Sequence, residues 1–74
     1  MTWKYASEES PSSNGWYVVW RQADEGEDHP PAEWQGIEEW RKGEWPEGDW
    51  GIARWWDQCF ANAAEAAEAP VPDP

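Results

Sequence analysis

The residues of this chain that could take part in acid–base or nucleophilic chemistry are one histidine, one cysteine and sixteen carboxylates. His29 lies in the segment Asp24–Pro30, among acids, glycine and proline. With no second histidine, an imidazole-based relay would need Cys59 as its nucleophile, and nothing in the sequence marks one carboxylate pair for acid–base work. We therefore predict no catalytic residues and no enzyme activity. The alternative hypothesis is an enzymatic or ligand-binding role, which would require turnover or small-molecule binding that depends on His29.

The segment Asp24–Pro30 also carries possible ligands for a hard cation. Its spacing departs from the pattern of a calcium-binding EF-hand loop, and zinc would need three or four nitrogen or sulfur ligands. A solvated acidic loop is therefore favoured, with no metal and no cofactor. Cys59 is the only cysteine, which excludes an internal disulfide, and its place on an apolar helical stripe predicts a buried thiol.

The composition limits how these groups can be positioned. A chain of 74 residues predicts one small domain, assigned to residues 1–69, followed by a flexible tail over residues 70–74. The chain has nine Trp and no Leu. Because each Trp can bury about 200 Å², a core built mainly from Trp can replace the missing aliphatic one. Trp45, which lies on no periodic stripe, is the best candidate for a surface anchor.

The N-terminal part predicts an antiparallel β-hairpin. In Gly15–Arg21, alternation with period 2 places Trp16, Val18 and Trp20 on one face. Thr2–Ala6 is a second short strand, and the connection between the two ends in Asn-Gly, which adopts positive φ at little cost. Residues 31–42 fit either a short helix or a third strand of this sheet.

The C-terminal part predicts the main helix, from about Trp50 to Ala69. Asp49 can cap its start and Pro70 stops it. Its apolar stripe consists of Ile52, Trp56, Cys59, Phe60, Ala63 and Ala67. The hairpin face expected to pack against it carries Trp3, Tyr5, Trp16, Val18 and Trp20. The predicted fold class is α+β, with an N-terminal antiparallel β-hairpin or three-stranded sheet packed on a C-terminal helix around a Trp-rich core.

The net charge of −11 is distributed unevenly. Residues 1–21 are neutral, residues 22–49 carry ten acids against Arg41 and Lys42, and residues 50–74 have a net charge of −3. Such a chain is repelled by nucleic acid and by anionic membranes, so direct binding to either is excluded. A concentrated negative surface instead favours a basic, nucleic-acid-binding protein as partner. The predicted partner-binding residues are Asp24, Glu25, Glu27, Asp28, Glu33, Glu38, Glu39, Glu44, Trp45, Glu47 and Asp49.

A short, strongly acidic, single-domain chain with no catalytic set resembles the small phage-encoded inhibitors of bacterial defence, including anti-CRISPR proteins and other DNA mimics. The resemblance rests on size and charge. It implies a non-enzymatic inhibitor that binds the nucleic-acid-binding surface of a host defence complex in the host cytoplasm. The N-terminus has neither an apolar nor a basic targeting pattern, which also predicts a soluble, cytoplasmic protein.

Two other interpretations of the same features stay open. The acids are also compatible with an ordinary solvated face, or with adaptation to a high-salt cytoplasm, although salt adaptation should acidify residues 1–21 as well. An exposed Trp patch would instead indicate a structural or adaptor protein that joins a larger assembly.

Overall fold

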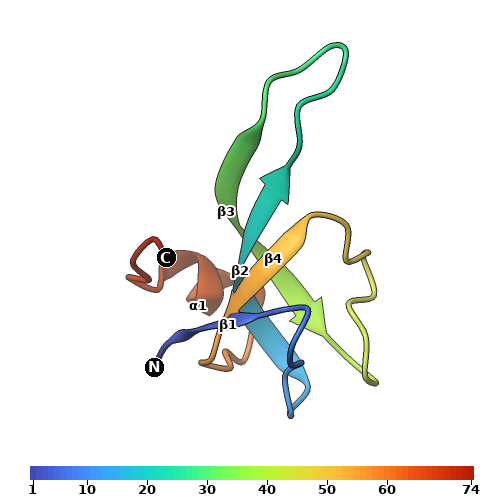
Figure 1. Ribbon diagram of the computed structural model, residues 1–74. Helices are drawn as coiled ribbons and strands as arrows, with labels where there is room; N and C mark the ends of the chain where they lie inside the picture. The colour runs from blue at the N-terminus through green and yellow to red at the C-terminus, as the bar shows by residue number, and fades with distance from the viewer.

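The computed structural model describes residues 1–74 as a four-stranded antiparallel sheet with one short helix (Figure 1). The α+β class predicted from the sequence is confirmed. The sheet has the order β1-β4-β2-β3, and each neighbouring pair is antiparallel. The elements are β1 (Trp3–Tyr5), β2 (Gly15–Ala23), β3 (Ala32–Trp40), β4 (Ile52–Trp56) and α1 (Ala63–Glu68).

The strand β2 is the centre of the sheet. It pairs with β3 along its whole length, from Gly15 opposite Trp40 to Ala23 opposite Ala32. Residues 31–42 therefore contain a strand, and the alternative of a short helix is wrong. The register explains this outcome, because it places the apolar Ile37 of β3 opposite Val18 of β2.

The N-terminal hairpin predicted between Thr2–Ala6 and Gly15–Arg21 is wrong, although both segments are strands. β4 lies between them: it pairs with β1 on one side and with β2 on the other. The predicted face is nevertheless shared, since the Trp3 ring centroid is 6.3 Å from that of Trp20. It is also 5.4 Å from that of Trp56, on the inserted strand.

The predicted helix from Trp50 to Ala69 is also wrong over most of its length. Residues 52–56 form β4, and only residues 63–68 are helical. The reason is visible in two adjacent side chains: Trp55 packs on Tyr17, with ring centroids 5.6 Å apart, whereas Trp56 packs on Trp3. Neighbouring residues point to opposite faces in a strand, but only about 100° apart in a helix.

The start of the helix α1 is fixed by its N-cap residue, Asn62. The side chain of Asn62 accepts a hydrogen bond from the Glu65 backbone N–H at 2.9 Å, and the Glu65 carboxylate accepts one from the Ala61 N–H at 3.3 Å. This reciprocal pair satisfies two N–H groups at the helix start, so Asn62 is the cap rather than Asp49.

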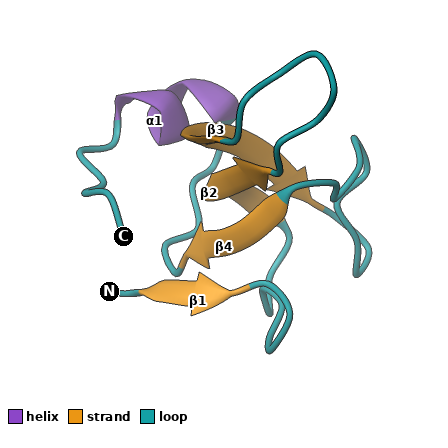
Figure 2. Cartoon of the chain, turned by 45° about the horizontal axis from the view of Figure 1, so that its top comes forward, coloured by secondary structure: helices purple, strands orange, loops and turns teal.

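Residues are buried on both faces of the sheet, and α1 lies on one side of it (Figure 2). On the face that carries α1, called the helix face, the buried residues are Val18, Phe60 and Ala66. On the opposite face, called the loop face, they are Tyr17, Val19, Trp40 and Trp55, with Ala6, Trp45 and Ile52 packed around them. Seven of the nine Trp residues are buried or half-buried, so a Trp-rich aromatic cluster is present, although only Trp40 and Trp55 are among the fully buried residues.

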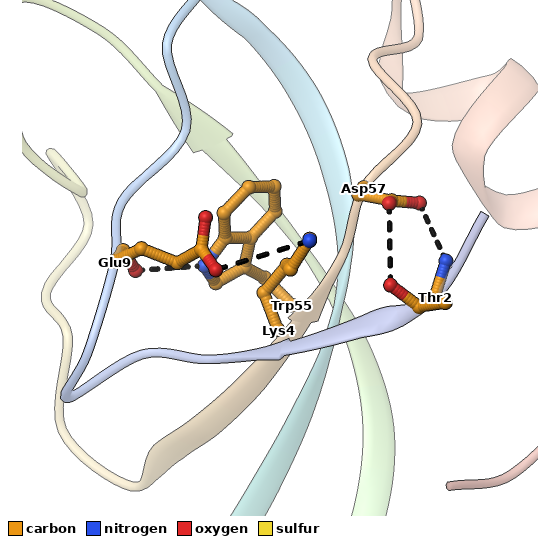
Figure 3. A network of polar contacts seen from close by, with 5 residues as sticks. All are labelled: Thr2, Lys4, Glu9, Trp55 and Asp57. Carbon is orange, nitrogen blue, oxygen red and sulfur yellow. Dashed lines mark hydrogen bonds and ion pairs between the residues drawn. The ribbon is translucent and has the colours of Figure 1, made fainter.

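Polar contacts at the edge of the sheet hold the N-terminal segment in place (Figure 3). The buried indole of Trp55 donates a hydrogen bond to the Glu9 carbonyl at 3.0 Å, and the Lys4 ammonium lies 3.8 Å from the Glu9 carboxylate. At the other end of β1, the Thr2 N–H donates to the Asp57 carboxylate at 2.8 Å. The segment after β1 is therefore drawn across Trp55, on the loop face.

Two smaller expectations concern the C-terminal part. The expectation that Cys59 is buried is wrong, because it belongs to the turn after β4 rather than to a helical stripe, and its side chain is exposed. Residues 70–74, expected to be a flexible tail, accept hydrogen bonds from side chains of the sheet through their backbone carbonyls. The Trp3 indole donates to the Pro72 carbonyl at 2.9 Å, and the Gln35 amide donates to the Val71 carbonyl at 3.0 Å.

Arg21 is the one buried charged residue, with an exposed fraction of 7%. Its guanidinium donates to the Glu38 carboxylate at 2.6 Å and to the Trp50 carbonyl, and it lies 5.2 Å from the centre of the Trp50 ring. Glu38 is therefore the counter-ion of a buried cation.

We predict that Glu38→Ala lowers the free energy of unfolding by about 3 kcal/mol, because it leaves the Arg21 guanidinium buried without its carboxylate. The matched control is Glu39→Ala, whose carboxylate is 4.0 Å from the more exposed Arg41, and which should cost under about 1 kcal/mol. Denaturant unfolding followed by tryptophan fluorescence measures both. Equal losses in the two variants would contradict the structural role of Glu38.

A second prediction concerns Tyr17, whose pKa is raised by burial and, to a smaller extent, by the neighbouring Cys59 thiol. The phenol stays protonated in the folded chain after it ionises in the unfolded chain, at about pH 10. Stability should therefore fall above pH 10 by about 1.4 kcal/mol for each pH unit. Denaturant unfolding between pH 9 and pH 11 measures this slope. Tyr17→Phe should make this slope shallower, and Tyr5→Phe should leave the contribution of Tyr17 to the slope unchanged.

Candidate protein-binding surfaces

The acids of residues 24–33 lie on a projecting hairpin. The Gln22 N–H donates to the Gly51 carbonyl at 2.7 Å, and beyond this point the hairpin of β2 and β3 has only two strands. The tip is closed by hydrogen bonds in both directions between Gly26 and His29. Residues 22–33 are called the acidic arm, and Figure 1 shows it extending away from the body. Its exposed acids are Asp24, Glu25, Glu27, Asp28 and Glu33.

The arm has no basic side chain to neutralise these acids. Between Arg21 and Arg41 the sequence contains no Lys or Arg, and His29 is the only other ionisable nitrogen group. The imidazole of His29 is exposed and lies against Gly26, where an added Cβ would be 2.5 Å from its Nε2. One ring nitrogen is 3.4 Å from the Pro30 carbonyl. The histidine thus belongs to the tip of the arm.

Glu38 and Glu39 do not belong to the acidic arm. Each is paired with an arginine of the chain itself, and they point to opposite faces of β3: Glu38 pairs with Arg21, and Glu39 lies 4.0 Å from Arg41. These two predicted binding residues are therefore already partly neutralised, unlike those at the tip.

The remaining predicted acids lie in the connection between β3 and β4. Glu44, Glu47 and Asp49 belong to this second region, which Figure 1 shows on a different side of the molecule from the tip of the arm. The structure thus separates the ten acids of residues 22–49 into an arm, a paired set and a loop. Sequence proximity had suggested a single surface.

Trp45, the candidate surface anchor, is half-buried. Its ring packs edge to face on Trp40, with centroids 4.8 Å apart, and on Tyr17 at 6.2 Å. These contacts make it part of the cover of the loop face. The more exposed indoles are those of Trp50, with an exposed fraction of 64%, and Trp34, with 37%.

Trp34 and Trp50 form a pair on the loop face, called the exposed Trp pair. Their ring centroids are 6.2 Å apart, and the Arg21 guanidinium lies against the Trp50 ring. The sequence does not predict this pair, because residues 31–42 fit a short helix as well as a strand and Trp50 is expected to begin the main helix. Period-2 alternation along β3, with Trp34 on the side of Arg21, could have indicated the first of them.

A pocket of about 540 Å³ lies on the loop face, between the segment after β1 and the connection between β3 and β4. Its apolar walls include Trp40, Trp45 and Ile52, and its polar lining includes Glu44 and Asp49. Trp45 is therefore a wall of a concave site rather than an isolated projection.

No family model, curated protein or solved structure matches this chain. Within the structure, no three side chains of His, Cys, Asp and Glu come close enough to hold a metal ion. No helix has both the length and the apolar character that crossing a membrane would require. The features that stand out are the acidic arm, the exposed Trp pair and the pocket.

Proposed function

We propose that this chain is a non-enzymatic inhibitor that binds the nucleic-acid-binding surface of a host defence complex through its acidic arm. The observation that carries the proposal is the arm itself, which presents five exposed carboxylates and no Lys or Arg on a narrow, projecting hairpin. The partner is a basic protein, and the site of action is the cytoplasm of the host cell, as in the anti-CRISPR and DNA-mimic class.

The shape of the arm supports this interpretation. A two-stranded hairpin is thin enough to enter a groove that accepts a nucleic-acid strand. Four of its five exposed acids, Asp24, Glu25, Glu27 and Asp28, lie in the turn between β2 and β3, so the negative charge gathers at the tip, where it would meet a basic groove first. Attraction of this kind accelerates association and weakens as salt increases.

A pair of charge reversals tests the proposal. Glu25→Lys/Glu27→Lys changes the arm, and Glu8→Lys/Glu68→Lys makes the same change of net charge at exposed positions outside residues 22–49. A partner captured from host lysate is purified, and its affinity for each variant is measured at several salt concentrations. The arm variant should bind at least tenfold more weakly at low salt, and the control should stay within about twofold of the unmodified chain.

Duplex DNA provides the second readout of the same experiment. If the arm occupies a nucleic-acid-binding surface, DNA should displace the chain from the purified partner. The proposal fails if the two charge-reversed variants bind equally well, or if DNA and the chain bind the partner simultaneously.

A second candidate function rests on the exposed Trp pair. An adaptor protein that joins a larger assembly would use exposed Trp rings as anchors, and Trp50 is the most exposed indole of the chain. The pair lies beside the Arg21–Glu38 ion pair, whose charges cancel, and so differs in charge from the arm. Its partner would bind mainly through apolar burial, with little dependence on salt.

The adaptor function predicts that Trp50→Ala weakens binding to the purified partner by about 2 kcal/mol, as for a hot-spot residue, with no change in salt dependence. Tyr5→Ala is the matched control, because Tyr5 is another exposed aromatic, on β1 at the far edge of the sheet. Calorimetric titration measures both. An unchanged affinity for Trp50→Ala would rule out the adaptor function and leave the arm.

A further inference from the structure

The pocket on the loop face has a lining suited to a cation. Two Trp rings, Trp40 and Trp45, form its aromatic walls, and Glu44 and Asp49 supply carboxylates. None of the lining residues is Lys, Arg or His. Neither carboxylate takes part in an ion pair, since the three ion pairs of the structure involve Glu9, Glu38 and Glu39. The negative charge at the pocket is therefore not neutralised within the chain.

Three consecutive turns hold the two carboxylate residues in place. The first closes with a hydrogen bond from the Glu44 N–H to the Arg41 carbonyl at 3.2 Å, and the Arg41 N–H donates back to the Glu44 carbonyl at 2.9 Å. Its central residues both have positive φ, the signature of a type I′ turn. The second closes from the Gly48 N–H to the Trp45 carbonyl at 3.0 Å. The third closes from the Ile52 N–H to the Asp49 carbonyl at 3.2 Å. Glu44 ends the first turn and Asp49 begins the third, so both backbones are fixed.

The two indoles stand almost at right angles. Their centroids are 4.8 Å apart with an interplanar angle of 74°, and Tyr17 also packs edge to face on Trp45. Both indoles line the pocket. A flat cation can lie on the face of an indole, where the ring quadrupole attracts it, while nearby carboxylates accept its hydrogen bonds.

We propose that this pocket binds the guanidinium group of an arginine side chain of the partner protein. Arginine fits better than lysine because its planar group stacks on an indole and carries five N–H donors. Two carboxylates, with the hydroxyls of Ser7 and Ser10 also in the lining, can accept them. The chain already uses this chemistry internally, since Arg21 lies 5.2 Å from the centre of the Trp50 ring and Arg54 lies 4.8 Å from that of Tyr5.

The proposal rests on the proposed function in one respect, which is that the partner is a basic, nucleic-acid-binding protein and so offers exposed arginines. Within that function the two acidic regions act differently. The arm attracts a basic groove from a distance, and the pocket accepts one side chain at close range. Two contacts on different sides of the molecule would also set the orientation of the chain on its partner.

The test uses the full chain and N-acetyl-arginine amide as the probe, with N-acetyl-citrulline amide as its neutral counterpart of nearly the same shape. The indole N–H signals of the nine Trp residues are followed by NMR during titration and assigned from single Trp→Phe variants. The arginine probe should shift the signals of Trp40 and Trp45 in a saturable manner. The citrulline probe should bind at least tenfold more weakly.

A matched pair of neutralising variants tests whether binding of the arginine probe requires the carboxylates of the pocket or those of the arm. Glu44→Gln/Asp49→Asn should weaken binding of the arginine probe at least tenfold, and Glu25→Gln/Glu27→Gln, which removes the same charge from the arm, should stay within about twofold. The Trp signals outside the pocket report whether each variant keeps its fold. Equal binding of citrulline, no saturable shift, or saturable shifts confined to Trp34 and Trp50 would each overturn the proposal.

Failure of the pocket and failure of the proposed function give different results. If the probe does not bind but the purified partner still requires the arm, the pocket proposal is overturned and the function stands. If the probe binds as expected but the charge reversals in the arm leave the affinity for the partner unchanged, the pocket stands as an arginine site and the inhibitor function is overturned.

Discussion

The structure depends on the burial of three consecutive residues of β2. Tyr17, Val18 and Val19 are each at most 3% exposed. Because neighbouring strand residues point to opposite faces, such a run requires cover on both faces of the sheet. A chain of 74 residues cannot supply a layer of helices for each face. It covers one with a short helix and its C-terminal segment, and the other with loops that carry large aromatic rings.

Cover made from loops is less complete than cover made from a helix, and the candidate sites follow from this difference. On the loop face, Trp40 and Trp45 protect Tyr17 but leave a pocket beside them. Farther along the same face the aromatic cover thins, and Arg21 fills the position next to Val19 with an ion pair to Glu38. The Trp50 ring then lies over the guanidinium and keeps most of its own surface exposed. One constraint thus produces both the pocket and the exposed Trp pair.

The sequence predicts those features of the fold that depend on local pattern. The strand β2 could be predicted because alternation depends only on neighbouring residues. The packing of Trp in the interior could be predicted because the chain has no leucine. The place of β4 between β1 and β2 could not, since strand pairing across fifty residues leaves no local turn signal. The helical stripe after Trp50 was misleading: Ile52 and Trp56 match a period of four, but Ile52 packs with the buried Trp55 on the loop face and Trp56 packs on the helix face, which one stripe of a helix does not allow.

The same distinction applies to the candidate sites. The exposure of Asp24, Glu25, Glu27 and Asp28 could be predicted, because a loop of acids, Gly and Pro cannot pay the cost of burying charge. The roles of Glu38 and Trp45 could not. Glu38 lies opposite Tyr17 in the register, so it reaches Arg21 across the strand pair, and Trp45 reaches Trp40 through a type I′ turn. Sequence proximity grouped residues that the sheet separates.

The separation of the acids bears on how a basic partner would meet them. Screening limits the reach of a charge to about 8 Å at physiological ionic strength, and the molecule measures 38 × 25 × 21 Å. On the proposed partner, the arm and the pocket would therefore act as two local sources of negative charge rather than as one field. Arg41 and Lys42 lie between them along the chain, and Arg41 partly neutralises Glu39. A uniform rod of negative charge would let a basic groove slide along it. Two separated sources, one a projecting arm and the other a concave site with aromatic walls, would favour a single orientation on the proposed partner, and the proposed inhibition of its surface would require that orientation to persist.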